Sequence, residues 1–351
     1  MRNALIGWIL TAIAAPAMAQ ELDESSPRRL AVSRNGERIA LASYDKLVRV
    51  WDAEGKLLHT LEVELPACAV AFSPDGTSLI AGTIGTRPNT SQPTRGKLYG
   101  WTLGSGEAKL RWKAPIVGST TAIAVEPKGQ WIAANTVYAT LGIYNLTDGA
   151  LIRNWQERGN SPSDLAISPD SRTIATAGQA WILWDAAREK LPDEMPAQAE
   201  KPLSAELSES FMKARKAGSI ATVIDGEGKW AIAVGAFDNR QGRAIDIAQL
   251  DMVSAKINKL IAKGVDGAEC VALTPDSRSL AVGLDSGMVK LFDVEGEKPT
   301  SEWEIEGRPR IRSVAYLKNG SQLAVATFGG QSVYLIDAQN GKLIKKLLST
   351  N

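Results

Sequence analysis

The residue types that most often catalyse reactions or bind metals are scarce in this chain of 351 residues. There is one histidine, His59, and there are two cysteines, Cys68 and Cys270. A zinc site, a bis-histidine haem or a serine–histidine–aspartate triad with a choice of bases requires more of these side chains. We therefore expect no catalytic site, no metal and no cofactor, and we interpret His59 as a solvated residue of an outer strand.

The remaining candidates for chemistry are the two thiols and a set of aspartates. The cysteines lie in distant units of the repeat described below, and a disulfide requires Cα atoms within about 7 Å of each other. We predict two buried, unpaired thiols. Asp75, Asp170 and Asp276 each stand in a turn sequence, so they do not form the paired arrangement of an acid and a base.

Charge and composition restrict the class of partner. The chain has 40 Lys and Arg residues, 39 Asp and Glu residues and a net charge of +1. A protein that binds nucleic acid or an anionic membrane needs a basic surface, which this balance disfavours. With 44% hydrophobic residues, the chain can bury a core.

The first 19 residues, MRNALIGWILTAIAAPAMA, have the pattern of a signal peptide. Arg2 precedes an apolar stretch, and Ala17-Met18-Ala19 supplies the small residues that a signal peptidase requires. The stretch is too short for an ordinary membrane span, which takes about 20 apolar residues. The Ala-rich signal resembles a bacterial one, so we expect a bacterial exported protein. We expect cleavage after Ala19 and a periplasmic or secreted protein with no membrane span; an uncleaved anchor is the alternative.

The rest of the sequence is an internal repeat. A nine-residue pattern recurs at 28–36, 68–76, 121–129, 163–171, 269–277 and 312–320, and a shortened copy occupies 221–228. Each copy is an apolar run that ends in a turn, as in Asp75-Gly76, which predicts a two-residue hairpin. Each copy is followed by a second run of residues that is apolar on both faces. A third run often ends in an aromatic residue and Asp, and a fourth run is more polar.

Four strands per unit, restarting every 46 residues or so over residues 28–350, are typical of the blades of a β-propeller. Strand-sized runs and tight turns exclude a helical solenoid. A strand that is apolar on both faces is buried on both faces, as it is between neighbouring blades.

Several segments resemble the WD-repeat family. They are VAFSPDG (70–76), LAISPDS (165–171), ALTPDS (272–277), SYDKLVRVWD (43–52) and WILWD (181–185). The resemblance covers nearly the whole chain after the signal and implies an all-β, seven-bladed propeller with four antiparallel strands per blade. It implies a binding scaffold more often than an enzyme.

The expected organisation is a signal peptide (1–19), a flexible tail (20–27) and one propeller (28–350), with blades near 28–65, 66–115, 116–160, 161–218, 219–264, 265–309 and 310–350. The first unit begins with its own inner strand and the last ends with its own outer strand. We therefore predict that no exchanged strand closes the ring.

The sequence departs from the family in its buried polar residues. The family's repeats usually carry a histidine before the inner strand, and its aspartate partner is matched here only by Asp45 and Asp285. We assign structural roles to these two aspartates and to the Trp51-Asp52 and Trp184-Asp185 pairs. Cohesion should then come from apolar burial, with a centre that lacks reactive groups.

Three insertions interrupt the pattern, at 84–96, 186–218 and 237–243, and we predict a short helix at 204–217 within the second. In a propeller all three would extend the same face. The candidate partner-binding residues are Arg87, Arg95, Phe237, Arg240 and Arg243, because arginine pairs well with carboxylates. The alternative is that these loops are insertions without a function and that their arginines are simply solvated.

Three functions are compatible with these features. The first is a non-catalytic, exported scaffold, monomeric within a complex, that binds a protein or peptide through the face with the insertions. The second is an accessory subunit of an envelope redox or assembly complex. The third is an exported propeller enzyme of the quinoprotein, haem or lactonase type, which the scarcity of ligand side chains disfavours.

Overall fold

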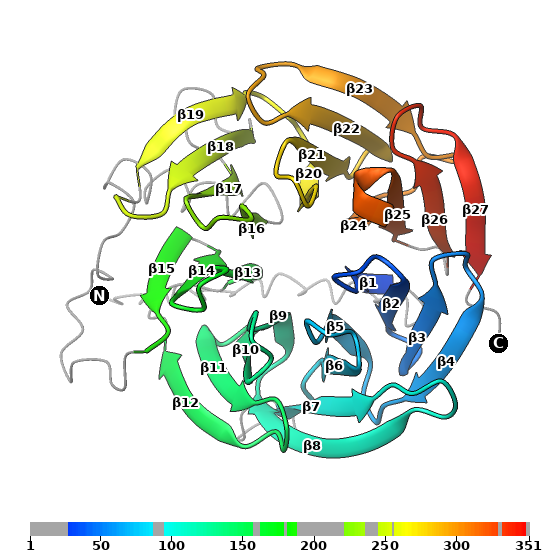
Figure 1. The fold of residues 1–351 in the computed structure, drawn as a ribbon, viewed down its shortest axis with the longest axis vertical. Coiled ribbons are helices and arrows are strands. Elements are labelled where there is room, and N and C mark those ends of the chain that lie inside the picture. Colours follow the sequence, from blue (N-terminus) through cyan, green and yellow to red (C-terminus); the bar gives the residue numbers. More distant parts are fainter. Residues whose placement is uncertain are drawn as a thin grey trace, which may run out of the picture.

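The computed structural model describes residues 27–86, 95–156, 162–178, 181–187, 221–235, 245–254, 256–328 and 332–348. These residues form a seven-bladed β-propeller, in which seven antiparallel sheets are arranged in a ring around a common axis (Figure 1). The expected all-β fold is confirmed. Six sheets have four strands, and the described part of the fourth blade contributes three.

The strands of the first three blades follow one another along the chain. Blade 1 contains β1 (Pro27–Val32), β2 (Arg38–Ser43), β3 (Leu47–Asp52) and β4 (Leu57–Glu62). Blade 2 contains β5 (Ala67–Phe72), β6 (Ser78–Thr83), β7 (Arg95–Thr102) and β8 (Lys109–Val117). Blade 3 contains β9 (Thr120–Val125), β10 (Trp131–Thr136), β11 (Thr140–Asn145) and β12 (Leu151–Gln156).

The remaining blades repeat this order. Blade 4 contains β13 (Asp164–Ile167), β14 (Thr173–Ala177) and β15 (Trp181–Asp185), and blade 5 contains β16 (Thr222–Ile224), β17 (Trp230–Gly235), β18 (Asp246–Asp251) and β19 (Ile257–Ala262). Blade 6 contains β20 (Ala268–Leu273), β21 (Ser279–Leu284), β22 (Met288–Asp293) and β23 (Pro299–Glu304). Blade 7 contains β24 (Ile311–Leu317), the 3-10 turn η1 (Lys318–Gly320), β25 (Gln322–Thr327), β26 (Ser332–Asp337) and β27 (Leu343–Leu348).

Within the described ranges, no helix is long and apolar enough to cross a membrane. The predicted helix at 204–217 lies outside the described residues, as do the signal peptide and nearly all of the expected tail. Strand β8 runs to Val117, two residues beyond the expected end of blade 2.

The propeller has two faces that differ in their connections. One face, here called the turn face, carries the turns between the first and second and between the third and fourth strands of each blade. The other, here called the loop face, carries the connections between the second and third strands and between successive blades. Backbone hydrogen bonds join the two kinds of loop-face connection, as from Val137 N to Ser119 O at 2.9 Å and from Val63 N to Lys46 O at 2.9 Å.

The inner hairpins are longer than the two-residue turns that the sequence predicts. Ser33 N donates to Arg38 O at 2.9 Å, so residues 34–37 form the loop, and Gly36 closes it with a positive φ of 70°. The hydroxyl of Ser33 also donates to Oδ1 of Asn35 at 2.7 Å. The prediction was wrong because this hydrogen bond stabilises a wider turn, in which only the residue after Asn or Asp is left-handed.

Seven apolar clusters hold the blades together, one at each junction between neighbouring blades. The second strands lie between two blades and are buried on both faces, as expected; all six residues of β6 are buried. Alanine is frequent there because neighbouring sheets approach closely near the axis. This confirms that cohesion between blades is largely apolar, at about 25 cal/mol per Å² of buried apolar surface.

The ring closes between blade 7 and blade 1 without a shared strand. Each sheet consists of strands consecutive in the chain, so the predicted absence of strand exchange is confirmed for the described residues. The junction is an apolar cluster in which Leu30 and Trp51 of blade 1 meet Leu335 and Leu347 of blade 7. On the turn face, Lys318 also pairs with Glu54 at 3.3 Å.

Tryptophan side chains pack between blades. Trp51, Trp101, Trp112, Trp155 and Trp184 are all buried. Two of these tryptophans, Trp155 and Trp184, lie on neighbouring blades with ring centroids 6.1 Å apart. Trp112 of blade 2 reaches the outer turn of blade 3, where its Nε1 donates to Leu146 O at 3.0 Å.

His59 is not solvated, contrary to the interpretation from sequence. It lies on β4 with only 9% of its surface exposed, because the next blade covers it. Burial lowers the pKa of His59, the charge of Arg38 lowers it further, and a hydrogen bond with the backbone of Gly104 in blade 2 opposes both. The imidazole is therefore part of the packing between blades 1 and 2.

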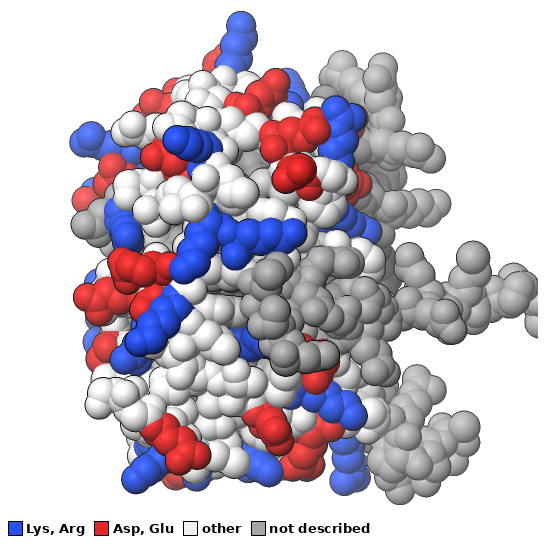
Figure 2. All heavy atoms as spheres, turned by 90° about the vertical axis from the view of Figure 1, so that its right-hand side faces the viewer, with Lys and Arg blue, Asp and Glu red and all other residues white. Residues whose placement is uncertain are grey.

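The outer wall over β27 and β4 carries acidic and basic side chains in alternation rather than a field of one sign (Figure 2). This distribution agrees with the nearly neutral net charge of the chain. It provides no broad basic surface on this side.

The contact between Trp112 and the outer turn of blade 3 gives a test of blade packing. Gly149 has a φ of 72°, and a β-carbon there would lie 2.5 Å from Cε3 of Trp112. We expect Gly149→Ala to lower the free energy of unfolding in urea by about 2–4 kcal/mol, from the left-handed backbone and the overlap together. The control Gly106→Ala has no atom within 4 Å and should change it by less than about 0.5 kcal/mol. Equal effects of the two variants would contradict this packing.

The turn aspartates predict part of the acid sensitivity. The pKa values of Asp75, Asp170 and Asp276 lie below the ordinary 3.8, chiefly because the hydroxyls of Ser73, Ser168 and Thr274 donate to them. A carboxyl with a lower pKa in the folded state stabilises the fold fully above its unfolded pKa, and this stabilisation is lost as the pH falls through the folded pKa.

Replacing all three aspartates by Asn, as found naturally at Asn35, keeps the hydrogen-bond acceptor and removes the titration. We expect urea unfolding of this variant to depend less on pH than that of the wild type below the ordinary aspartate pKa of 3.8. An unchanged slope of stability against pH would contradict the assignment.

Candidate functional site

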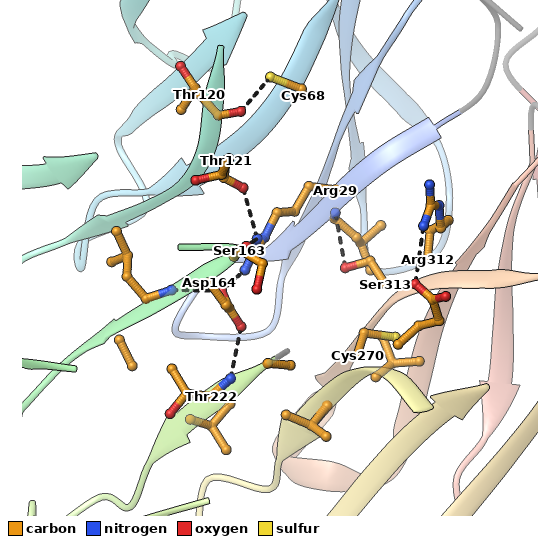
Figure 3. A pocket seen from close by; sticks show the side chains of 18 of the residues that line it. Arg29, Cys68, Thr120, Thr121, Ser163, Asp164, Thr222, Cys270, Arg312 and Ser313 are labelled. Carbon is orange, nitrogen blue, oxygen red and sulfur yellow. Dashed lines mark hydrogen bonds and ion pairs between the residues drawn. The ribbon is translucent and has the colours of Figure 1, made fainter. Parts of the chain in front are cut away.

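The central channel contains a cavity of about 720 Å³ to which all seven blades contribute (Figure 3). Its walls are the inner strands β1, β5, β9, β13, β16, β20 and β24 and the residues next to them. Tyr44, Ile84 and Val137 line it from loop-face connections, and Leu273 lines it near the end of β20. The cavity thus extends from the loop face into the channel.

A β-bulge recurs at the start of the inner strand in five blades. The register with the second strand skips one residue there, and the skipped residues are Arg28, Cys68, Thr121, Glu269 and Arg312. A bulge leaves its extra residue outside the ladder and re-aims the side chain. The last four of these residues line the cavity, so the bulges bring polar side chains to the loop-face end of the channel, here called the channel mouth.

Arg29 and Asp164 form an ion pair across the channel, from blade 1 to blade 4 (Figure 3). Nη1 of Arg29 also donates to Thr121 O at 3.1 Å and to Ser163 O at 3.3 Å. Oδ1 of Asp164 accepts from Leu165 N at 2.9 Å, and Oδ2 accepts from Thr222 N at 3.1 Å in blade 5. One cation and one carboxylate therefore connect four blades through the centre of the ring.

A second ion-pair cluster joins blades 6 and 7. Glu269 is 96% buried, and its Oε1 accepts from Arg310 Nε at 2.9 Å while its Oε2 pairs with Arg312 Nη1 at 3.1 Å. The guanidinium of Arg312 lies over the ring of Phe328, 5.1 Å from the centroid. The side chain of Arg310 is 42% exposed, so it forms the outer part of this cluster.

These charges correct the expectation of a centre without reactive groups. That expectation followed from counting histidines and cysteines, whereas the channel mouth is made from arginine and carboxylate side chains. The repeat itself contains a pattern that reveals these charged residues. The nine-residue copy at 163–171 begins with Ser163-Asp164, and the copies at 269–277 and 312–320 begin with Glu269 and Arg312. The bulge interrupts the alternation by which inward and outward positions are assigned.

Both cysteines line the cavity as buried thiols that form no disulfide, as predicted. Cys68 Sγ donates to Thr120 O at 2.9 Å. Burial, together with the charge of the neighbouring Glu269, raises the pKa of Cys270 to about 12. A thiol that stays protonated is a poor nucleophile.

The described side chains of this arrangement offer charged groups and hydrogen-bond donors to which a ligand could bind. Both carboxylates hold guanidinium groups, and across the described ranges no three His, Cys, Asp or Glu residues come together as a possible metal site. Ser119 and Ser313 add hydroxyl groups to the lining of the cavity. Ser313 Oγ accepts a hydrogen bond from Leu30 N at 3.3 Å across the junction of blades 7 and 1.

Of the candidate partner-binding residues, Arg95 alone falls in the described part of the chain. It is exposed and begins β7, and its backbone pairs with Thr86 at 2.9 and 3.0 Å at the base of the first insertion. Arg87, Phe237, Arg240 and Arg243 lie outside the described residues.

Of the six residues assigned structural roles, the four aspartates lie in or beside turns, and the two tryptophans lie in strands and pack between blades. Asp52 accepts from Lys56 N at 2.7 Å, and Asp185 accepts from Ala187 N at 2.9 Å. Asp45 pairs with the buried Arg49 at 2.6 Å. Trp184 Nε1 donates to Thr176 Oγ1 at 3.0 Å, Trp51 is 3% exposed, and Asp285 N donates to Gly267 O at 2.7 Å.

Comparison with known protein families agrees with the fold. A β-propeller family model described as nucleolar protein 10-like, N-terminal domain, matches residues 220–351. A model described as WD domain, G-beta repeat, matches residues 22–52. Together with the seven blades, these matches support a WD-repeat propeller family, whose members generally act as scaffolds without catalysis.

One curated relative is the WD repeat-containing protein SL1-17 of Schistosoma mansoni. It is 33% identical over 73 residues, which cover 21% of this chain and 24% of the relative. The alignment thus spans about a quarter of that protein. The relative is eukaryotic, and nothing in these comparisons bears on the expected bacterial origin or export.

The ion pair across the channel predicts strong coupling between Arg29 and Asp164. Their side chains are 27% and 11% exposed, so water screens the pair only in part. In a double-mutant cycle with Arg29→Gln and Asp164→Asn, we expect a coupling of about 1–3 kcal/mol in the free energy of urea unfolding.

The exposed pair Arg308–Glu304 provides the control, with side chains 72% and 42% exposed. The double-mutant cycle of this pair, with Arg308→Gln and Glu304→Gln, should give a coupling of less than about 1 kcal/mol in the free energy of urea unfolding. Additive effects of Arg29→Gln and Asp164→Asn would show that the pair does not connect the blades.

Proposed function

We propose that this protein is a non-catalytic scaffold that binds a protein or peptide partner through its loop face. The observation that carries the proposal is the channel mouth, which opens among the loop-face connections and whose carboxylates Asp164 and Glu269 already hold arginines. Groups fixed in this way present a defined pattern of charge and hydrogen-bond donors. The family matches favour the same kind of function.

The positions of two of the three insertions support the choice of face. The segments between β6 and β7 and between β17 and β18 connect second to third strands, and the segment between β15 and β16 connects two blades. The first and the third insertions therefore leave from the loop face. The second leaves β15 on the turn face, where Ala186 N donates to Arg172 O at 2.8 Å, and reaches β16 on the loop face, so the expectation that all three extend one face is wrong for its first end. Long connections in a compact domain often carry binding residues, so Arg87, Arg95, Phe237, Arg240 and Arg243 remain our candidates for contact with the partner.

The proposal includes export. The pattern of residues 1–19 supports a signal that is removed after Ala19, and this would place the scaffold in the periplasm or outside the cell. The partner would then be an envelope or extracellular protein.

Crosslinking followed by mass spectrometry on the native protein tests both the face and the export. We expect crosslinks to a partner from residues of the loop face and an N-terminal peptide that begins at Gln20. Changing Arg87, Arg95, Arg240 and Arg243 to Ala should abolish capture of the partner.

The matched control changes four exposed cations of the turn face, Arg34, Lys128, Arg172 and Arg278, to Ala and should leave capture intact. Crosslinks concentrated on the turn face, or loss of capture in the control alone, would contradict the proposed face. An intact N-terminus in the native protein would contradict export.

A further inference from the structure

The channel mouth carries more hydrogen-bond donors than acceptors. It holds three guanidinium groups (Arg29, Arg310 and Arg312) and two carboxylates (Asp164 and Glu269), a local net charge of 3 − 2 = +1. Each guanidinium has five N–H donors, whereas a carboxylate has about four acceptor positions. A ligand that complements this cluster must supply acceptors and negative charge.

The acceptors of the two carboxylates are already engaged. Asp164 accepts from Arg29, Leu165 N and Thr222 N. Glu269 accepts from Nε and Nη2 of Arg310 and from Nη1 of Arg312, and it is 4% exposed. A cationic ligand would have to displace an arginine from a buried carboxylate, which is costly.

Arg310 is the part of the cluster that an incoming group reaches first. Its side chain is 42% exposed, and Glu269 fixes it through Nε and Nη2. Within the described ranges its Nη1 group has no hydrogen-bond partner. The side chain is therefore both oriented in advance and able to donate further, which lowers the entropic cost of binding an anion.

The chemistry favours a carboxylate over a polyanion. An arginine fork matches the two oxygens of a carboxylate, and Ser119, Thr121 and Ser313 line the adjoining cavity of about 720 Å³. A nucleic acid would need an extended basic surface, whereas the chain has a net charge of +1 and mixed charges on the wall seen in Figure 2.

We infer that the channel mouth binds an acidic peptide segment, with Arg310 as the residue that holds a carboxylate of the partner and Arg312 behind it. This inference rests on the proposed scaffold function and specifies the chemistry of its partner. It places the recognition of charge at the connection between blades 6 and 7, apart from the three insertions.

Fluorescence anisotropy with a labelled hexaglutamate peptide at low ionic strength tests the inference. We expect the full-length protein to bind hexaglutamate and not hexaglutamine. Arg310→Gln should weaken binding by roughly tenfold or more, as expected for a lost charge-assisted hydrogen bond. Arg308→Gln is the matched control, because Arg308 lies two residues away on the same connection, is 72% exposed and pairs with Glu304.

The assignment would be supported if Arg308→Gln weakens the binding of hexaglutamate by less than about twofold and if Arg310→Gln leaves the thermal midpoint of unfolding unchanged. Equal weakening by the two variants, equal binding of hexaglutamine, or no binding of hexaglutamate would overturn it. Competition by inorganic phosphate at the concentration of the peptide would also overturn it, since the site would then be a general anion site. Loop-face crosslinks that persist in Arg310→Gln, combined with failed peptide binding, would leave the scaffold function standing and remove only this inference.

Discussion

The junction between blades 7 and 1 is the interaction on which the rest of the structure depends, because no strand crosses it in the described part of the chain. The ring stays closed through an apolar cluster built from Leu30, Ile39 and Leu41 on one side and Leu317, Leu335 and Leu347 on the other. Apolar contact is non-directional, so the closure depends on how well the two surfaces fit. The small side chains Ala324 and Ala326 allow that close approach.

The charged residues of the channel add direction to this apolar closure. Arg29 extends from the first strand to Thr121, Ser163 and Asp164 on blades 3 and 4, while Leu30 N, next to it, donates to Ser313 of blade 7. The strand that follows the N-terminal segment is thereby held from both sides of the channel. The same side chains shape the channel mouth, so the geometry that closes the ring also defines the surface offered to a partner. A buried ion pair contributes little net stability in many proteins, but it fixes which groups face which.

The repeat predicted the fold well and the site poorly, for physical reasons that particular residues show. Strands with apolar residues on both faces, such as β6, and glycines in turns, such as Gly36, reflect local constraints that any blade must meet. Glu269 and Arg312 escaped notice because their bulges break the two-residue alternation, and because their partners lie in other blades. The interpretation of His59 as solvated was wrong because the neighbouring blade buries part of the outer strand. The polarity of the outer strand's own residues does not reveal this burial. The prediction of two-residue hairpins was wrong because side-chain hydrogen bonds stabilise a wider loop.

Hydrogen–deuterium exchange of the intact protein measures the closure of the ring most directly, since amides exchange at a rate set by the local free energy of opening. If the apolar cluster and the ion pair close the ring, the amides of β1 and β24 at the junction will be protected as strongly as those of β5 and β9, which lie elsewhere in the ring. Exchange of β1 and β24 well ahead of β5 and β9 would show that blades 7 and 1 separate readily, and would contradict a ring held shut by side-chain packing alone.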